Sequence, residues 1–164
     1  MEWLIGARYA LTPRKKLTNA GVVVEEGVIV EVGDFEKLKH KYPRYERIGG
    51  REYLLVPGFV NAHTHVAMTL FRGVEDDKPL DAWLREAIWP KEAKLRPEDC
   101  YAGALLGCLE MVLNGVTCFL DMYFYEEEVG KAAKEVGIRA FLGVGVIDFP
   151  LPDAKTPKEA LKNA

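Results

Sequence analysis

Two histidines separated by one residue, His63 and His65, follow the apolar run at residues 58–62. Side chains two positions apart on a strand point to the same face, so both imidazoles can reach one metal ion. Zinc binds histidine nitrogens at about 2.0–2.1 Å. Such pairs are more often structural than functional, but parallel α/β folds carry their sites at the carboxyl ends of buried strands, where this pair lies. We therefore predict that His63 and His65 bind a metal ion.

The elements that must position the pair alternate between strands and helices from Pro57 onward. The pattern predicts strands over residues 58–62, 116–122 and 138–147, and helices over 80–89, 97–113 and 126–136. Such alternation is typical of a parallel sheet with right-handed crossovers, in a doubly wound sheet or in a (β/α)8 barrel. A barrel needs ~250 residues, so residues 56–164, with three strands, would form less than half of one.

Prolines, glycine and apolar spacing set the limits of these helices. Pro79 begins the helix over 80–89 and Pro90 ends it, because proline disrupts a helix interior. Pro97 begins the next helix, and Asn114 and Gly115 end it. Apolar residues at i, i+4, i+7, i+8 and i+11 predict its buried face. That face comprises Tyr101, Leu105, Cys108, Leu109 and Val112.

Residues 1–55 have a different, β-rich character. A strand is expected over residues 3–11, and two β-branched arms around Glu26-Gly27 predict a tight hairpin over 22–32. Asp34 is a candidate cap for a short helix over 35–41, and residues 53–56 are expected to be extended. This segment is too small to bury a large core alone, so we expect it to pack against more chain.

Composition excludes several classes of protein. The chain has 164 residues, 49% of them hydrophobic, and a net charge of −3, which gives no electrostatic surface for nucleic acid. No run reaches the ~18–20 apolar residues of a membrane span, and no secretory signal is visible. The three cysteines, Cys100, Cys108 and Cys118, form no CxxC pair. We expect them to be free thiols in a cytoplasmic protein.

The segments PGFVNAHTHVAMTLFRGVEDDKPLDAWL and NGVTCFLDMYF resemble the amidohydrolase superfamily, in the branch of methylthioadenosine/S-adenosylhomocysteine deaminases and triazine chlorohydrolases. The resemblance implies a (β/α)8 barrel in which residues 56–164 form the first three β/α units. Residues 1–55 would supply the N-terminal strands of a small β-sandwich. It also implies one divalent metal ion, zinc first and iron as the alternative, with His63 and His65 as the first two ligands. Metal-bound hydroxide would attack a ring carbon that carries an amino or chloro group.

The resemblance also suggests residues that contact substrate. Glu92 matches a carboxylate that binds ribose hydroxyls in the family, although beside Lys91 and Lys94 it could equally be a solvated charge. Trp83 and Trp89 could stack on a purine or triazine, or belong to the core. Asp121 ends a strand on the side of the site, and we assign it no metal.

Two departures from the family limit these expectations. The remaining ligands and the proton-transferring groups of the family lie on later strands, and no histidine follows His65. We therefore expect no catalytic residue in this segment, no deaminase activity from the chain alone, and weak or absent metal. The position near Val144, where thionucleoside deaminases carry an arginine, is apolar, which weakens the case for recognition of a substrate carboxylate.

Three hypotheses remain open. The first is the N-terminal fragment of a metal-dependent hydrolase that deaminates or dechlorinates a small heterocycle, since a helix capped by Thr156 begins only eight residues before Ala164. The second is a non-catalytic half-barrel that assembles as a homo-oligomer or with a separate C-terminal half, because its last strand leaves an unpaired edge. The third is a small doubly wound protein in which both histidines are structural. None of the three hypotheses includes nucleic acid or a membrane as a partner.

Overall fold

A computed structural model describes residues 1–163 and divides the chain into two compact units, with the boundary between Pro57 and Gly58. The first unit is a four-stranded mixed sheet in the order β3-β2-β1-β4. Its elements are β1 (Glu2–Leu11), β2 (Lys16–Glu25), β3 (Val28–Asp34), α1 (Phe35–Lys41) and β4 (Glu46–Leu55). The β1–β2 and β2–β3 pairs are antiparallel, and β1 pairs with β4 in parallel.

The sequence predicted most of this unit. The hairpin between β2 and β3 is confirmed, and its two turn residues, Glu26 and Gly27, both have positive φ, as a tight hairpin turn requires. The Asp34 carboxylate accepts a hydrogen bond from the amide of Lys37 at 3.1 Å, which confirms it as the cap of α1. Buried Leu38 of α1 packs on Leu4 and Val23 of the sheet.

Strand β4 is much longer than the predicted extended segment. It begins at Glu46, and the glycines at 49 and 50 concealed it because glycine is unfavourable in strand interiors. Gly49 has a φ of +84°, and a Cβ atom there would lie 2.2 Å from the carbonyl oxygen of Gly6 on β1. The glycine therefore allows the two strands to approach, and its role is visible only once they are paired.

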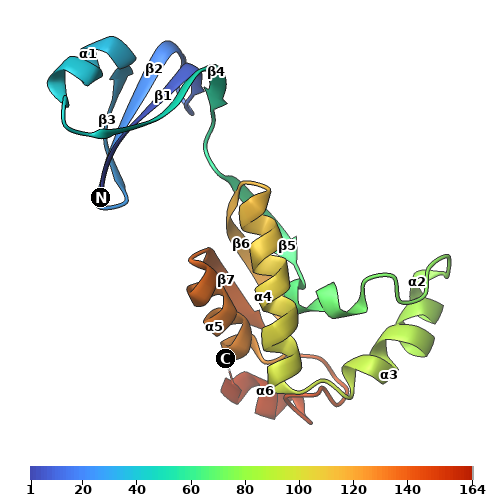
Figure 1. The fold of residues 1–164 in the computed structure, drawn as a ribbon. Helices are drawn as coiled ribbons and strands as arrows, with labels where there is room; N and C mark the ends of the chain where they lie inside the picture. The colour runs from blue at the N-terminus through green and yellow to red at the C-terminus, as the bar shows by residue number, and fades with distance from the viewer. Residues whose placement is uncertain (164) are drawn as a thin grey trace. The chain divides into compact units, whose positions relative to one another are not determined.

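The second unit is built on a parallel sheet in the order β5-β6-β7. Its strands are β5 (Phe59–Thr64), β6 (Val116–Tyr123) and β7 (Arg139–Val144), and the third ends earlier than predicted. The short helix η1 (Val66–Phe71) and the long helices α4 (Pro97–Leu113) and α5 (Glu126–Val136) pack together on one side of it (Figure 1). Phe119 of β6, with no exposed surface, lies at the centre of the resulting core.

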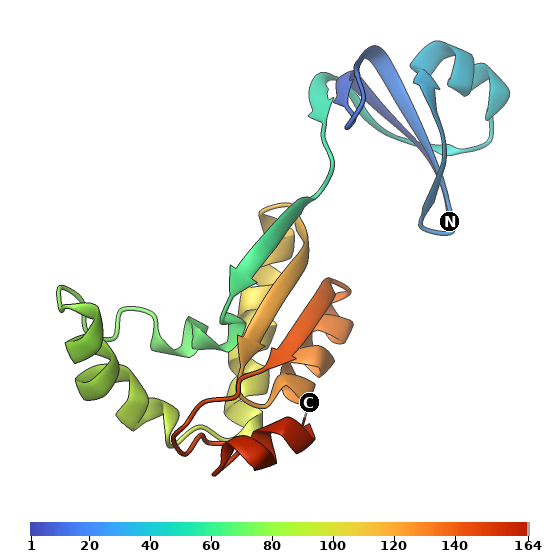
Figure 2. The same ribbon diagram turned by 180° about the vertical axis from the view of Figure 1, so that it is seen from behind.

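The opposite face of this sheet has no helix across it in the part of the chain that the structure describes (Figure 2). Large apolar side chains are exposed on its strands. On the uncovered face these are Val60 of β5, Leu120 and Met122 of β6, and Phe141 of β7. The sheet is therefore covered on one side only, unlike the doubly wound arrangement that the strand pattern also allowed.

The predicted buried face of α4 is wrong in part. Leu109 and Val112 are exposed, whereas the buried residues are small: Cys100, Gly103, Ala104, Gly107 and Cys108. The reason is the close approach of η1. A Cβ atom at Gly103 would lie 2.5 Å from the carbonyl oxygen of Ala67, so only glycine fits there. Apolar periodicity selects large side chains and misses an interface made of small ones.

The helix predicted over 80–89 does not end at Pro90. It comprises α2 (Leu80–Ala82), a π-helical segment η2 (Trp83–Ile88) and α3 (Trp89–Glu92). Pro90 lies in the first turn of α3, where a missing amide hydrogen costs little. The helix therefore continues to Glu92, and this extension brings that residue into the site described below.

The last helix, α6 (Pro157–Asn163), begins where predicted, with the Thr156 hydroxyl accepting from the amide of Glu159 at 3.2 Å. Across residues 1–163, none of the helices combines the length and the apolar character needed to span a bilayer.

Candidate metal and substrate site

The two histidines lie where β5 gives way to η1. His63 is the fifth residue of β5, and His65 is the N-cap of η1. The β5–β6 register shifts between Asn61 and Thr64, so β5 carries an extra residue beside the pair. The two ring centres are nevertheless 5.0 Å apart and the rings are nearly perpendicular. Two imidazoles on one tetrahedral zinc ion, with Zn–N of 2.0–2.1 Å, have their centres about 5 Å apart. The pair therefore fits a shared metal ion.

A hydrogen bond fixes the ring of His65. Its Nδ1 lies 2.6 Å from the carbonyl oxygen of Met122 on β6. A carbonyl oxygen can only accept, so Nδ1 carries the proton and Nε2 of the neutral ring has a free lone pair. Metal-binding histidines commonly make this second contact, which orients the ring and strengthens the ligand.

His65 also lines a cavity of about 320 Å³ in the second unit. The three predicted substrate residues, Trp83, Trp89 and Glu92, line the same cavity. Its other walls are mostly apolar: Met68, Leu80, Leu84, Ile88, Met122, Tyr123, Phe124, Gly145, Ile147 and Phe149. The volume is in the range of small-molecule sites, which are mainly apolar with a few polar groups.

Glu92 is the one carboxylate in this cavity. It is 8% exposed, so it is not the solvated charge that the sequence also allowed. The hydroxyl of Tyr123 donates a hydrogen bond to its Oε1 at 2.7 Å. Burial raises the pKa of Glu92, and this hydrogen bond partly opposes the rise. Burial, followed by the nearby Glu92, raises the pKa of Tyr123, which keeps the phenol protonated as the donor.

Tyr123 was missed by the sequence analysis. It lies two residues after Asp121 on β6, so the alternation of the strand was the available signal. Trp83 is half-buried, and Trp89 is exposed with its ring 5.2 Å from that of Phe149. Neither tryptophan is a core residue, which leaves both free to contact a ligand.

Asp121 is almost completely buried behind the histidines, with 1% of its surface exposed. Its carboxylate accepts hydrogen bonds from the amides of Val66 and Met122. Burial raises its pKa, against the effect of these two hydrogen bonds. Within residues 1–163, no three or more histidine, cysteine, aspartate or glutamate side chains are grouped to hold a metal ion, so the described chain offers the His63–His65 pair alone.

Comparison with known protein families identifies the chain. The model of the amidohydrolase family matches residues 54–164, which include β5, β6 and β7. The chain belongs to the amidohydrolase family. A model of the imidazolonepropionase-like composite domain of bacteria matches residues 20–44 in the first unit. The resemblance inferred from the sequence is thus confirmed.

Curated proteins similar to this chain include two deaminases. The 5-methylthioadenosine/S-adenosylhomocysteine deaminase of Thermodesulfovibrio yellowstonii is 47% identical over 168 residues, covering 99% of this chain and 38% of the relative. The 5'-deoxyadenosine deaminase of Methanobrevibacter smithii is 43% identical, covering 90% of this chain and 38% of the relative. The chain therefore spans about two fifths of the length of these relatives.

Solved structures similar to this chain are likewise covered over less than two fifths of their length. An adenosine deaminase from Xanthomonas campestris with bound zinc is 34% identical with a TM-score of 0.85, covering 99% of this chain and 38% of that one. An atrazine chlorohydrolase from Arthrobacter aurescens, complexed with zinc, is 25% identical with a TM-score of 0.74, covering 87% of this chain and 35% of that one.

Proposed function

We propose that this chain is the N-terminal part of a metal-dependent hydrolase that deaminates an adenosine-type nucleoside. The observation that carries the proposal is the cavity shared by His65, Trp83, Trp89 and Glu92. The named activities of the curated relatives favour deamination over dechlorination of a triazine. Residues 1–55 would belong to a β-sandwich, and residues 56–164 would form the first three β/α units of a (β/α)8 barrel.

In this proposal His63 and His65 hold one divalent ion, zinc in preference to iron. A bound ion of this kind lowers the pKa of water and so supplies a nucleophile at neutral pH. The hydrogen bond from His65 Nδ1 to Met122 keeps Nε2 available as a ligand. Because His65 is both a ligand and a wall of the cavity, a ring bound there would have its reacting carbon close to the ion.

Glu92 would bind the sugar. Its Oε1 accepts from Tyr123, and the second oxygen is available to accept from a ribose hydroxyl. Trp83 and Trp89 would stack on the base and exclude water from one side of it. These roles give the cavity a polar end for the sugar and an apolar wall for the heterocycle.

A second proposal concerns assembly. Val60 of β5 and Phe141 of β7 are each more than 60% exposed on the sheet face opposite the helices. An apolar face of this kind requires a partner, and we infer that the partner is the C-terminal remainder of the barrel. Association of two copies through the same face is the competing outcome, and analytical ultracentrifugation of the 164-residue chain distinguishes them. A dimer supports self-association, and a monomer that binds an apolar dye supports an open face.

Tryptophan fluorescence tests the proposed substrate. Only three tryptophans are present, and a Trp3→Phe background leaves Trp83 and Trp89 as reporters. We expect 5'-deoxyadenosine to quench this fluorescence, and Glu92→Gln to weaken its binding while leaving that of free adenine unchanged. Equal loss for both ligands, or no quenching, would contradict the assignment. The chain alone is expected to release no ammonia, and metal-dependent release would overturn its description as a fragment.

A further inference from the structure

Asp121 on β6 connects that strand to the beginning of η1, next to the candidate site. Its Oδ2 accepts from the amide of Val66 at 3.1 Å, and its Oδ1 accepts from the amide of Met122 at 2.9 Å. Val66 directly follows His65, and the Met122 carbonyl accepts from the His65 ring at 2.6 Å. One buried carboxylate thus holds the backbone next to the histidine on one side and the residue that orients its ring on the other.

The amides of Val66 and Met122 are both hydrogen-bond donors, and a carboxylate is well suited to accept from both. Val66 is the first residue of η1, and the first amides of a helix have no acceptor within it. A carboxylate offers two accepting oxygens and no donor, so it can satisfy two N–H groups at once. An asparagine would direct its NH2 group at one of them and leave a buried amide without an acceptor. A buried amide without an acceptor lowers the stability of the fold, and Asp121 is only 1% exposed, so water cannot replace the missing acceptor.

We propose that Asp121 is a positioning residue for His65. It fixes the β5–β6 junction so that Met122 O meets Nδ1 and Nε2 faces the metal position. This inference rests on the proposed metal role of His65, since positioning matters only if that ring is a ligand. Asp121 itself contacts neither substrate nor metal in this assignment.

The test compares Asp121→Asn with Glu110→Gln, a matched change of carboxylate to amide on α4, where Glu110 pairs with Arg72. The first readout needs no metal. Nitrogen-15 NMR of the histidine rings at pH 7.5 reports which nitrogen of His65 carries the proton. We expect the Nδ1–H form in the wild type and in Glu110→Gln, and a mixture of both forms in Asp121→Asn.

The second readout is zinc affinity by calorimetry. Loss of a group that supports a metal-binding histidine typically costs 10–100-fold in affinity, so we expect at least about tenfold weaker zinc binding for Asp121→Asn. A variant that is less stable but retains the Nδ1–H form and the wild-type zinc affinity would overturn the proposal and leave Asp121 with a purely structural role.

Two controls keep the outcomes distinct. If Asp121→Asn does not fold, NMR couplings across the hydrogen bonds of the wild type still test whether Asp121 and Met122 make the proposed contacts. Couplings from Val66 N to the Asp121 carboxyl, and from His65 Nδ1 to the Met122 carbonyl, are expected, and absence of either overturns the proposal. If His65→Ala leaves zinc binding unchanged, the proposed metal site fails, whereas the tautomer measurement still reports on Asp121.

Discussion

The carboxylate of Glu126 is buried without a partner, and its ionisation should make stability depend on pH. Glu126 begins α5 and is 6% exposed, and neither of its oxygens has a hydrogen-bond partner among residues 1–163. Burial, followed by the negative charge of Asp121, raises its pKa from 4.5 to about 8. The backbone of Tyr123 opposes part of the rise, and the charges of Asp153 and Glu127 add to it. The folded chain therefore holds this proton at pH values where the unfolded chain has lost it.

The sign and size of the effect follow from that difference. A carboxyl whose pKa is raised on folding contributes its full stability below pH 4.5 and loses it as the pH rises toward 8. Each pKa unit corresponds to about 1.4 kcal/mol. Between pH 4.5 and pH 7 the free energy of unfolding should therefore fall by about 3 kcal/mol on account of this one group.

Glu126→Gln removes the ionisation and preserves the shape of the side chain. We expect the variant to gain about 3 kcal/mol relative to the wild type between pH 4.5 and pH 7. Urea unfolding followed by circular dichroism at each pH measures the difference. Any constant effect of the amide on the helix terminus cancels in that comparison, and so does the pH dependence that Glu92 contributes in both proteins.

Glu127→Gln is the matched control, because Glu127 is exposed in the same turn of α5. Its pH dependence should follow the wild type. Identical pH profiles for Glu126→Gln and the wild type would refute the reasoning, since they would mean that Glu126 ionises normally in the folded chain.

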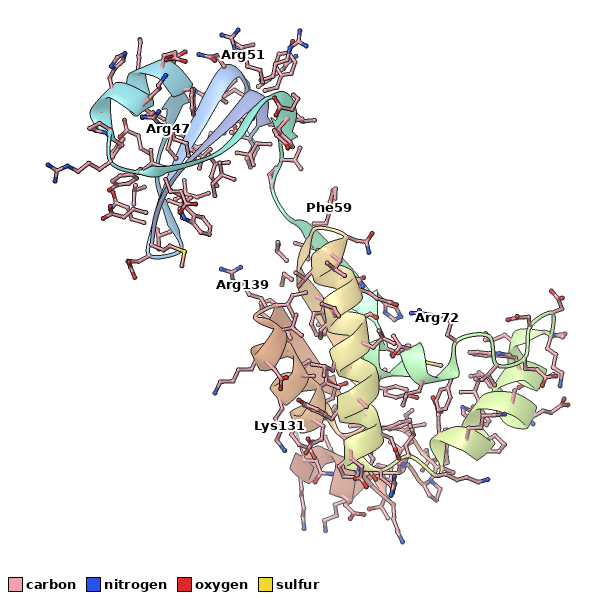
Figure 3. All side chains as sticks on the ribbon, viewed as in Figure 1. Arg47, Arg51, Phe59, Arg72, Lys131 and Arg139 are labelled. Carbon is pink, nitrogen blue, oxygen red and sulfur yellow. The ribbon has the colours of Figure 1, made fainter. Side chains whose placement is uncertain are left out.

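Two further substitutions test the packing around the site. Gly103→Ala should destabilise the chain by about 1–3 kcal/mol, because the new Cβ would lie 2.5 Å from Ala67 O on η1. Thermal unfolding measures this, and an unchanged midpoint would show that η1 does not approach α4 so closely. Arg72→Ala should leave the stability of the chain almost unchanged, because exposed ion pairs contribute little. The Arg72 side chain lies on the surface (Figure 3), and its partner Glu110 is exposed as well. A larger loss in urea unfolding would show that this pair anchors η1.

The sequence predicted the elements whose signals are local. The hairpin at Glu26-Gly27, the cap at Asp34 and the beginning of α4 at Pro97 depend on a few neighbouring residues, and all three are present. Strand β4 was largely missed because Gly49 is favourable only beside Gly6, a partner that lies far away in the sequence. The small-residue face of α4 was missed for the same reason, since it depends on the position of η1.

In the candidate site, too, the features with local sequence signals were predicted and those that depend on distant residues were not. His63 and His65 could be found from their spacing, although the irregularity in β5 beside them could not. Glu92 was found by resemblance, but its burial depends on a helix that continues through Pro90 and on the hydroxyl of Tyr123. Asp121 was expected to end a strand, whereas β6 continues to Tyr123. One of its two amide partners is the neighbouring Met122, but the other, Val66, lies 55 residues away and could not be found from sequence periodicity.

X-ray absorption spectroscopy of the zinc-loaded chain tests the central claim, that His63 and His65 share a metal ion. The chain has three histidines, and His40 lies on α1 in the first unit, so His40→Ala is the control. We expect two imidazole ligands in the wild type and in His40→Ala, and one in either His63→Ala or His65→Ala. An unchanged imidazole count in the His63→Ala/His65→Ala double variant would contradict the account.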